Sequence, residues 1–348
     1  MFPFSLRPQA HEIIRTWAFY TLVKSHFHFD MIPWKEVLIS GWGIAGEGMG
    51  KISKSRGSGS MGPMEMIERY SADAVRYWAA STGTGKDSVI SEEKIQMGAR
   101  LATKMWNVAH FSEKFLEGYE PPEDEELPQL TPADGWILSS LQKLIRRVTQ
   151  FLLEYEYAAA KNEIESFFWR ELADNYLEMC KQRLYDKENS KREGALYSLY
   201  QVLLTTLKLF APFLPYVTEE IYLNIFQKDG RRVDYADVDR ASSNSIHTSA
   251  WPVPDPRLEN DSSEALGETL VGIATAVRRY KSEHNLPLGS EMGKLQISSA
   301  DGEAEELEAA SQDLMSITRA RLVEIVRQPD PGLEHLENET KFQIDIEP

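Results

Sequence analysis

The sequence predicts an α+β chain that is mainly α: a short α/β segment, an antiparallel helical bundle and a small C-terminal α/β domain. Three observations carry this prediction. The apolar run at residues 37–39 is bounded by turn-forming residues, which is typical of a buried strand, and it opens onto a glycine-rich loop. Residues 132–226 repeat apolar side chains at helical spacing over several long segments, which indicates a bundle. Two short apolar runs, at 294–297 and 323–326, flank an acidic helix.

The composition allows two or three globular domains and excludes a generally basic surface. The chain has 348 residues, of which 42% are hydrophobic, and a formal net charge of −16. A chain of this size can bury more than one core. Because no overall positive field would attract nucleic acid, any contact with RNA must come from local groups of Lys and Arg.

The single cysteine and the hydropathy pattern exclude several classes of protein. Cys180 alone cannot form an internal disulfide framework or a Cys-rich zinc site, and we expect a buried thiol on a helix. The N-terminus lacks the charged and apolar regions of a signal peptide, and no run of about 18 apolar residues could span a membrane. We therefore expect a soluble, cytoplasmic protein with no membrane partner, no metal site such as zinc and no prosthetic group.

Periodicity predicts three helices and one strand in the N-terminal third. Apolar residues at helical spacing predict an amphipathic helix over 7–26, and a strand follows at 37–40. A second helix is expected over 64–81 and a third over 95–117, with Ser91 as the cap before it.

The clearest domain boundary is the acidic, proline-containing stretch 118–128, which has no helical or strand periodicity. Beyond it we expect three long helices, one from residue 132, one over 158–184 and one over 195–210. A shorter helix, with Thr218 as its N-cap, follows. The aromatic stripes of these helices are interpreted as core.

The C-terminal part reads as a small α/β domain. After a linker at 255–262, the pattern predicts a helix over 263–283, a strand at 294–297, an acidic helix over 303–319 and a strand at 323–326.

A glycine-rich loop, residues 41–57, is the stretch with the most specific chemistry. It contains six glycines, and Lys51 and Lys54 stand three residues apart within it. On composition alone a solvent-facing loop is the commoner interpretation. Paired ammonium groups on a mobile loop after a strand also suit a polyphosphate, because nucleotides bind at the carboxyl ends of parallel strands.

The string Lys51-Ile52-Ser53-Lys54-Ser55 resembles the Lys-Met-Ser-Lys-Ser signature of class I aminoacyl-tRNA synthetases, with Ile52 in place of Met. The surrounding sequence is similar to the valyl branch of that family in its archaeal-type form. The resemblance implies that all five residues of the string, together with Gly41, bind ATP. It also implies that Lys54, helped by Lys51, is catalytic and stabilises the departing pyrophosphate.

Two further positions take their expected roles from the resemblance. The family carries Gly-x-Asp followed five residues later by Trp, and this chain has Ala10-His11-Glu12 and then Trp17. The resemblance implies that Glu12 faces the ATP ribose and that Trp17 forms a wall of the amino-acid pocket.

The helical region resembles the anticodon-binding domain of the valine, isoleucine and leucine enzymes. Four segments occur in the family's order, at 134–138, 168–169, 212–220 and 249–252. A tRNA-binding role is therefore expected, and its candidate phosphate contacts are Arg146, Arg147, Lys181 and Arg183. Each of these is, taken alone, more often a solvated surface charge, and phosphate contacts would set affinity rather than sequence preference.

The resemblance implies a division into four parts. Residues 1–62 would be the second half of a Rossmann-type catalytic fold, and 63–100 a connector. Residues 101–258 would be the helical anticodon-binding domain, and 259–348 the small α/β domain. The implied function is that of a valine–tRNA ligase, which joins valine to tRNA through valyl-adenylate, with ATP and Mg²⁺ as substrate.

None of the seven histidines stands in the family's His-x-Gly-His spacing, and an editing domain is not recognised. We therefore interpret the chain as a C-terminal portion that is inactive alone and needs an N-terminal synthetase half as partner. Such a partial sheet should expose an unpaired edge and apolar helix faces. The alternatives are a catalytically inactive tRNA-binding paralogue or fragment and, less well supported, a purely structural helical protein.

Overall fold

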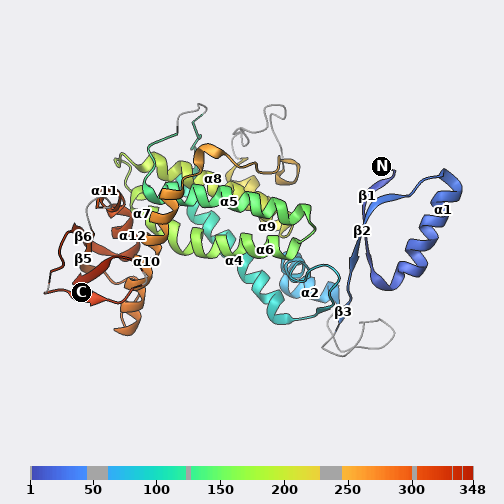
Figure 1. The fold of residues 1–348 in the computed structure, drawn as a ribbon, viewed down its shortest axis with the longest axis horizontal. Coiled ribbons are helices and arrows are strands. Elements are labelled where there is room, and N and C mark those ends of the chain that lie inside the picture. The colour runs from blue at the N-terminus through green and yellow to red at the C-terminus, as the bar shows by residue number, and fades with distance from the viewer. Residues whose placement is uncertain are drawn as a thin grey trace. The chain divides into compact units, whose positions relative to one another are not determined.

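The computed structural model describes residues 2–44, 62–122, 127–227, 245–299, 304–330, 332–338 and 340–347. The chain divides into two compact units. The first unit comprises Met1–Met105, Val148–Asn162 and Pro212–Val217; the second comprises Trp106–Arg147, Glu163–Ala211 and Thr218–Pro348. Figure 1 shows the order of the elements within them.

A parallel two-stranded sheet begins the chain. β1 (Phe4–Ala10) pairs with β2 (Trp34–Ser40), so that Ala10 lies opposite Ser40. The connection is helical: a 3-10 turn (His11–Ile13), a π-helical turn (Ile14–Ala18) and α1 (Phe19–Phe29).

The helix predicted over 7–26 is therefore wrong for residues 7–10, which form the end of β1. Pairing with a strand far along the chain outweighs the local helical spacing there. Pro8 has no N–H, and it is tolerated because β2 is the only neighbour of β1 among the described strands.

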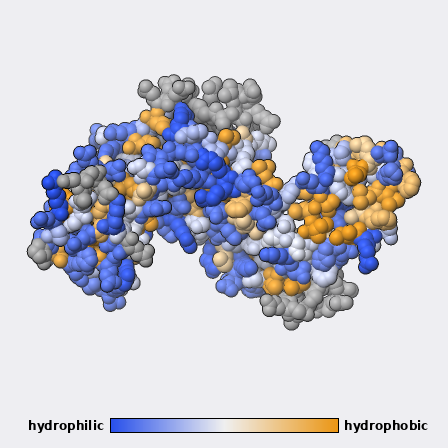
Figure 2. All heavy atoms as spheres, in the orientation of Figure 1, coloured by the Kyte–Doolittle hydropathy of each residue, from blue (hydrophilic) through white to orange (hydrophobic). Residues whose placement is uncertain are grey.

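The strand predicted at 37–40 is confirmed, but it is not buried, because Val37 is 39% exposed. Large apolar side chains of α1 are exposed as well, including Phe27 and Phe29. Figure 2 shows hydrophobic residues gathered over the part of the chain that is blue in Figure 1. Two strands and one crossover cannot cover both faces of a parallel sheet, so the predicted exposure of apolar faces is confirmed.

The helix predicted over 64–81 is broken in two, as α2 (Pro63–Tyr70) and α3 (Ala72–Ala79). The break falls at Ser71, whose φ is 91°. Ser71 Oγ accepts a hydrogen bond from the N–H of Ala74 and so caps α3. A positive φ favours glycine, so Ser71 holds a backbone conformation that few side chains adopt.

Side chains of α3 hold the start of α9 (Pro215–Ile225). The Asp73 carboxylate accepts from the backbone N–H of Tyr216 at 3.2 Å and of Val217 at 2.8 Å. These are otherwise unsatisfied donors of the first turn, so Asp73 serves as the helix cap. The prediction that Thr218 caps this helix is wrong, since α9 already begins at Pro215.

α4 (Glu92–Leu116) agrees with the helix predicted over 95–117. Ser91 Oγ accepts from the N–H of Lys94 at 3.2 Å, which confirms the predicted cap. Before it, β3 (Gly43–Ile44) and β4 (Ser88–Val89) form a short parallel pair.

The helical bundle follows the predicted segments closely. Its remaining elements are α5 (Pro132–Leu153), α6 (Tyr157–Ser166), a π-helical stretch (Phe167–Tyr176), α7 (Leu177–Tyr185) and α8 (Arg192–Phe210). The aromatic stripes are core as predicted: Phe168, Tyr176 and Phe210 have no exposed area. Cys180 is buried on α7, and burial raises the pKa of its thiol.

The C-terminal α/β segment contains both predicted strands and two that the sequence did not reveal. Its elements are α10 (Asp261–Glu283), β5 (Met292–Ser298), α11 (Ala304–Ala309), α12 (Ser311–Thr318), β6 (Ala320–Val326), β7 (Glu334–Leu336) and β8 (Gln343–Glu347). The sheet order is β6-β5-β8-β7, with β5 parallel to β6 and antiparallel to β8. The acidic helix predicted over 303–319 is the pair α11 and α12.

None of the helices in the described part of the chain combines the length and apolar composition that a membrane crossing requires.

Candidate nucleotide and RNA sites

The carboxyl ends of β1 and β2 bring two predicted ATP-binding residues to one edge. Because Ala10 pairs with Ser40, Glu12 and Gly41 follow the two strands at the same end of the sheet. The imidazole of His11 lies against the indole of Trp42, with 4.5 Å between ring centroids. This is the edge at which parallel sheets bind nucleotides.

Gly41 is required by a close approach of two backbone segments. A Cβ at this position would lie 2.3 Å from the carbonyl carbon and oxygen of Lys86. Beside it, the N–H of Trp42 donates to Asp87 Oδ1 at 2.7 Å, and the N–H of Ser88 donates to the Trp42 carbonyl at 2.7 Å. The base of the glycine-rich loop is thereby fastened to residues 86–88.

The five predicted ATP-binding residues of the loop itself lie outside the described residues. They are Lys51, Ile52, Ser53, Lys54 and Ser55. Their roles stay predictions.

Trp17 presents an open aromatic surface on the π-helical turn after β1. It is 57% exposed, and the guanidinium carbon of Arg7 lies 5.4 Å from its ring centroid and 5.1 Å from that of Trp34. Its exposure leaves it accessible as a pocket wall, the role that the resemblance implies.

Two buried polar groups near this edge were not singled out from the sequence. Gln9 is only 7% exposed, yet neither atom of its side-chain amide has a hydrogen-bond partner within the described structure. The same holds for Nε1 of Trp42. Buried polar groups without partners are uncommon in proteins, and periodicity offers no signal for them.

The four cations predicted to contact phosphate differ in exposure. Arg146 pairs with Glu259, and Nε of Arg147 lies 3.0 Å from Glu163 Oε2; both arginines are about half exposed. Lys181 donates to Glu178 one turn before it on α7. These three cations remain accessible candidates.

Arg183 is different, because its side chain has no exposed area. Nη1 and Nη2 donate to the two carboxylate oxygens of Asp134 at 2.8 and 2.9 Å, and Nε donates to Asp313 Oδ1 at 2.8 Å. The Tyr176 hydroxyl and the backbone N–H of Thr131 donate to the same Asp134 carboxylate. Burial contradicts the prediction that Arg183 contacts a phosphate, and we correct it to the centre of a buried ion cluster.

The cluster shifts the pKa values of its members. Burial raises the pKa of Asp313 to about 6, although Arg183 opposes this shift. Burial would lower the pKa of Arg183, but the two aspartates outweigh it and raise that pKa.

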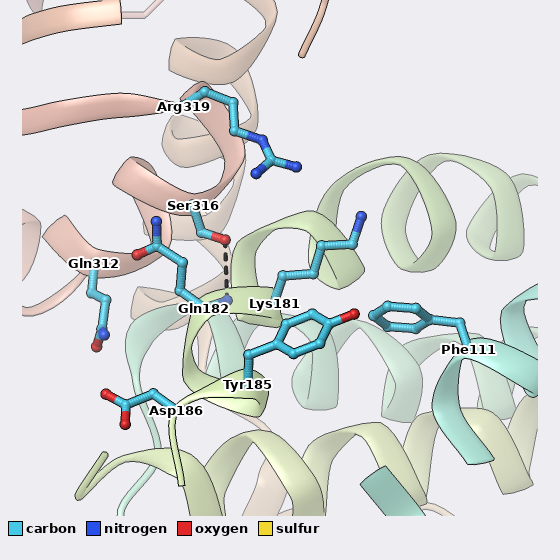
Figure 3. A pocket seen from close by; sticks show the side chains of 8 residues that line it. All are labelled: Phe111, Lys181, Gln182, Tyr185, Asp186, Gln312, Ser316 and Arg319. Carbon is cyan, nitrogen blue, oxygen red and sulfur yellow. Dashed lines mark hydrogen bonds between the residues drawn. The ribbon is translucent and has the colours of Figure 1, made fainter. Parts of the chain in front are cut away.

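A pocket of about 630 Å³ lies beside α7 (Figure 3). Its lining consists of Phe111, Lys181, Gln182, Tyr185, Asp186, Gln312, Ser316 and Arg319. The charged ends of Lys181 and Arg319 face the same open space near the rings of Tyr185 and Phe111, whereas the Asp186 carboxylate points elsewhere. The structure thus gathers one predicted cation with three residues that sequence reasoning missed.

Lys114 extends the aromatic side of this pocket. It donates to the Tyr185 hydroxyl, and its ammonium lies 4.4 Å from the Tyr185 ring centroid and 4.6 Å from that of Phe111. Exposed rings next to cations are the combination that binds an unpaired base and its phosphate. The signal available in the sequence was Lys181 and Tyr185, which are one helical turn apart.

Two family models match the chain. The anticodon-binding domain of tRNA ligase matches residues 134–297, and tRNA synthetases class I (I, L, M and V) matches residues 1–91.

Curated relatives align over most or all of the chain. The valine–tRNA ligase of Wolbachia sp. subsp. Brugia malayi is 37% identical over 100% of this chain and 38% of its own length. That of Methanopyrus kandleri is 41% identical over 99% of this chain and 36% of its own length. That of Ehrlichia canis is 41% identical over 85% of this chain and 35% of its own length. The chain therefore spans between about one third and two fifths of the relatives it matches.

A solved structure supports the fold. The LeuRS of Agrobacterium radiobacter K84, in a ternary complex with tRNA and LeuAMS, superposes with a TM-score of 0.53 at 20% identity. The superposition covers 74% of this chain and 29% of that one.

Proposed function

The chain belongs to the class I tRNA synthetases, and from this premise we propose that it is the part of a valine–tRNA ligase that carries the Lys51–Ser55 side of the active site and the anticodon-binding helices. The observation that carries the proposal is the alignment of the whole chain with valine–tRNA ligases at about 40% identity. The further length of those relatives would supply the remainder of the active site. We therefore propose that valine activation needs this chain together with such an N-terminal half.

The proposed chemistry at the sheet edge is formation of valyl-adenylate. The valine carboxylate attacks the α-phosphorus of ATP, pyrophosphate leaves, and the adenylate then acylates the terminal ribose of tRNA. Lys54, helped by Lys51, stabilises the charge that develops on pyrophosphate, which is electrostatic catalysis by a preplaced cation. Glu12 faces the ribose, and Trp17 forms a wall of the valine pocket.

Mg²⁺ would enter this site with the ATP phosphates. Among the described residues, no group of His, Cys, Asp or Glu is arranged to hold a metal ion by itself. The position of the lysine pair after a strand suits the phosphates that the ion would neutralise.

The proposed tRNA site lies at the helical bundle, in the pocket beside α7 that Phe111, Lys181 and Tyr185 help to line. An unpaired base would stack on an exposed ring, and Lys181 would contact its phosphate. Arg146 and Arg147, whose side chains are about half exposed on α5, are proposed as additional phosphate contacts.

The tRNA part is tested by binding. We expect this chain to bind a fluorescent tRNA transcript with a valine anticodon more tightly than one whose anticodon loop is replaced, as measured by anisotropy across a salt series. The affinity should fall steeply with salt because phosphate contacts release counterions. Equal or absent binding of the two transcripts would contradict the proposal.

The catalytic part is tested with the N-terminal half of the ligase supplied. Lys54→Ala should slow valine-dependent ATP–pyrophosphate exchange by about 100-fold or more, with little change in the KM for valine. Lys187→Ala, at an exposed lysine of the bundle, is the matched control and should leave exchange unchanged. Unaltered exchange by Lys54→Ala would refute its catalytic role. Tight tRNA binding with no exchange by the unaltered protein would instead select the catalytically inactive tRNA-binding paralogue.

A further inference from the structure

We propose that the C-terminal α/β segment is a working part of the RNA site: α12 and Arg319 form one wall of the pocket, and Asp313 positions that wall through Arg183. This inference rests on the proposed tRNA binding and deepens it. It assigns an RNA contact to a segment outside the helical bundle. The ligand chemistry is an unpaired nucleotide of RNA, with an aromatic face for its base and cations for its phosphate.

The first step of the argument is that α12 supplies three of the residues that line the pocket. Gln312 and Ser316 lie on α12, and Arg319 is its C-cap residue. Facing them across the pocket are Lys181 and Tyr185, on α7 of the bundle (Figure 3). The pocket is therefore built jointly by the bundle and the C-terminal segment.

The second step is that specific hydrogen bonds hold α12 against α7. Ser316 Oγ donates to the Glu178 carbonyl at 2.6 Å and accepts from the N–H of Gln182 at 3.4 Å. Both partners are backbone groups of α7, so a single small side chain sets the contact between the two helices.

The third step is the buried ion pair beneath this contact. Nε of Arg183 donates to Asp313 Oδ1 at 2.8 Å, and the other oxygen of Asp313 accepts from the hydroxyl of Thr131 at 2.9 Å. Asp313 is 1% exposed. These charge-assisted hydrogen bonds connect α12 both to α7 and to Thr131, the residue that precedes α5. Asp313 is thus a positioning residue, and it does not itself reach the pocket's lining.

The fourth step concerns the charge that the wall presents. Arg319 has a φ of 63°, and its N–H bonds to the Met315 carbonyl, so the chain turns directly from α12 into β6. Its guanidinium is 46% exposed and lies 4.0 Å from Glu178, the same carboxylate that pairs with Lys181. Two cations share one nearby anion, which leaves positive charge for a phosphate.

The experiment compares four forms of the chain in binding a tRNA transcript with a valine anticodon over a salt series. The forms are the unaltered chain, Arg319→Gln, Asp313→Asn and Arg321→Gln. Arg321, two residues from Arg319 and 74% exposed, pairs with Glu291 and is absent from the pocket lining, which makes it the matched control.

We expect Arg319→Gln to raise the Kd about tenfold and to lower the slope of log K against log salt by a little under one, as the loss of one phosphate contact predicts. Arg321→Gln should change both quantities much less. Equal effects of the two arginine variants would overturn the inference, because they would reflect net charge alone.

Asp313→Asn separates positioning from charge by the sign of its effect. Removing a negative charge should tighten RNA binding if only the overall field matters, whereas a displaced wall should weaken it. We expect a higher Kd, and a lower Kd would overturn the positioning role. If this variant is too unstable to assay, Ser316→Ala takes its place as a test of whether the contact of α12 with α7 positions the wall, and an unchanged Kd there would overturn that positioning.

Failure of the inference and failure of the proposed function give different results. No tRNA binding by the unaltered chain would overturn both. Normal binding by the unaltered chain and by Arg319→Gln would overturn the inference alone.

Discussion

The first 44 residues and the second unit differ in how completely they bury their apolar side chains and pair their buried polar groups. In the N-terminal segment Phe27 is 80% exposed, and the buried amide of Gln9 has no partner among the described residues. In the second unit Phe168 and Phe210 have no exposed area, and the guanidinium of Arg183 is held by two carboxylates. The second unit therefore supplies partners for its buried charge, whereas the described part of the N-terminal segment supplies none for the Gln9 amide.

The comparison teaches that a self-contained core can be recognised by the hydrogen-bond partners of its buried polar groups as well as by the burial of its apolar side chains. A buried polar or charged group is tolerated only when it has such partners. The Arg183 cluster meets that condition, whereas Gln9 does not. We therefore expect the second unit to account for most of the stability of the chain. The first two predictions test buried charged groups of that unit, and the last compares it directly with the N-terminal segment.

The largest effect should come from Arg183→Met. It leaves Asp134 and Asp313 as buried carboxylates without their cation, and we expect a loss of about 3 to 5 kcal/mol in the free energy of unfolding, measured with urea. Arg147→Met is the matched control, because Arg147 is 52% exposed and pairs with Glu163 at the surface. It should cost less than about 1 kcal/mol. Similar losses for both variants would mean that the buried cluster stabilises the second unit no more than a surface ion pair does.

An intermediate effect should come from Glu171→Gln. Burial, with Glu264 and Glu163 nearby, raises the pKa of Glu171 from 4.5 to about 7, while Ser140 and Arg147 oppose the shift. The folded protein therefore keeps a proton that the unfolded chain releases, and stability falls as the pH rises from about 4.5 to 7.

At pH 8 the glutamine variant should be more stable than the unaltered chain by roughly 2 to 3 kcal/mol. The decrease in the free energy of unfolding between about pH 4.5 and 7 should be smaller in this variant. Unfolding curves at several pH values would check it. Glu188→Gln, at an exposed carboxyl, should leave the pH dependence as it was. A pH profile unaffected by Glu171→Gln would refute the assignment.

The smallest effects are expected at two valines, one in the second unit and one in the N-terminal segment. Val202 on α8 has no exposed area, and Val202→Thr should cost about 1 to 2 kcal/mol because it buries a hydroxyl. Val37 on β2 is 39% exposed, and Val37→Thr should change the free energy of unfolding by less than about 0.5 kcal/mol. Thermal melts of both variants check this. An equal cost at the two positions would mean that this face of β2 is covered.

The sequence predicted the bundle well because its helices bury their own apolar stripes, and a 3.6-residue repeat reports that burial directly. It failed where distant partners decide the structure. Residues 7–10 have helical spacing but pair with β2. β7 and β8 are short strands: β8 pairs with β5, and β7 pairs with β8. Ser71 breaks a helix that its neighbours favour, through a backbone angle that periodicity cannot show.

For the candidate sites, the resemblance supplied Glu12, Trp17 and Gly41, and the structure shows Glu12 and Gly41 at one edge. It also supplied Arg183, whose charge suggested a surface position. The Asp residues that bury Arg183 are 49 and 130 positions away in the sequence, so no local pattern could reveal the cluster. The pocket beside α7, which we propose binds RNA, was missed for the same reason, since residues of α4, α7 and the α12 segment line it.

The π-helical stretch Phe167–Tyr176 fixes the number of residues that the helix over 157–185 can contain. Its wider turns hold more residues than α-helical turns, and Nδ2 of Asn175 donates to the Arg170 carbonyl five residues earlier at 2.6 Å. Arg278 of α10 donates in turn to Asn175 Oδ1 at 3.0 Å. A deletion or insertion of one residue would rotate everything after it about the helix axis and turn Arg183 away from Asp134. Over these residues, homologous chains should vary in side chains far more freely than in length.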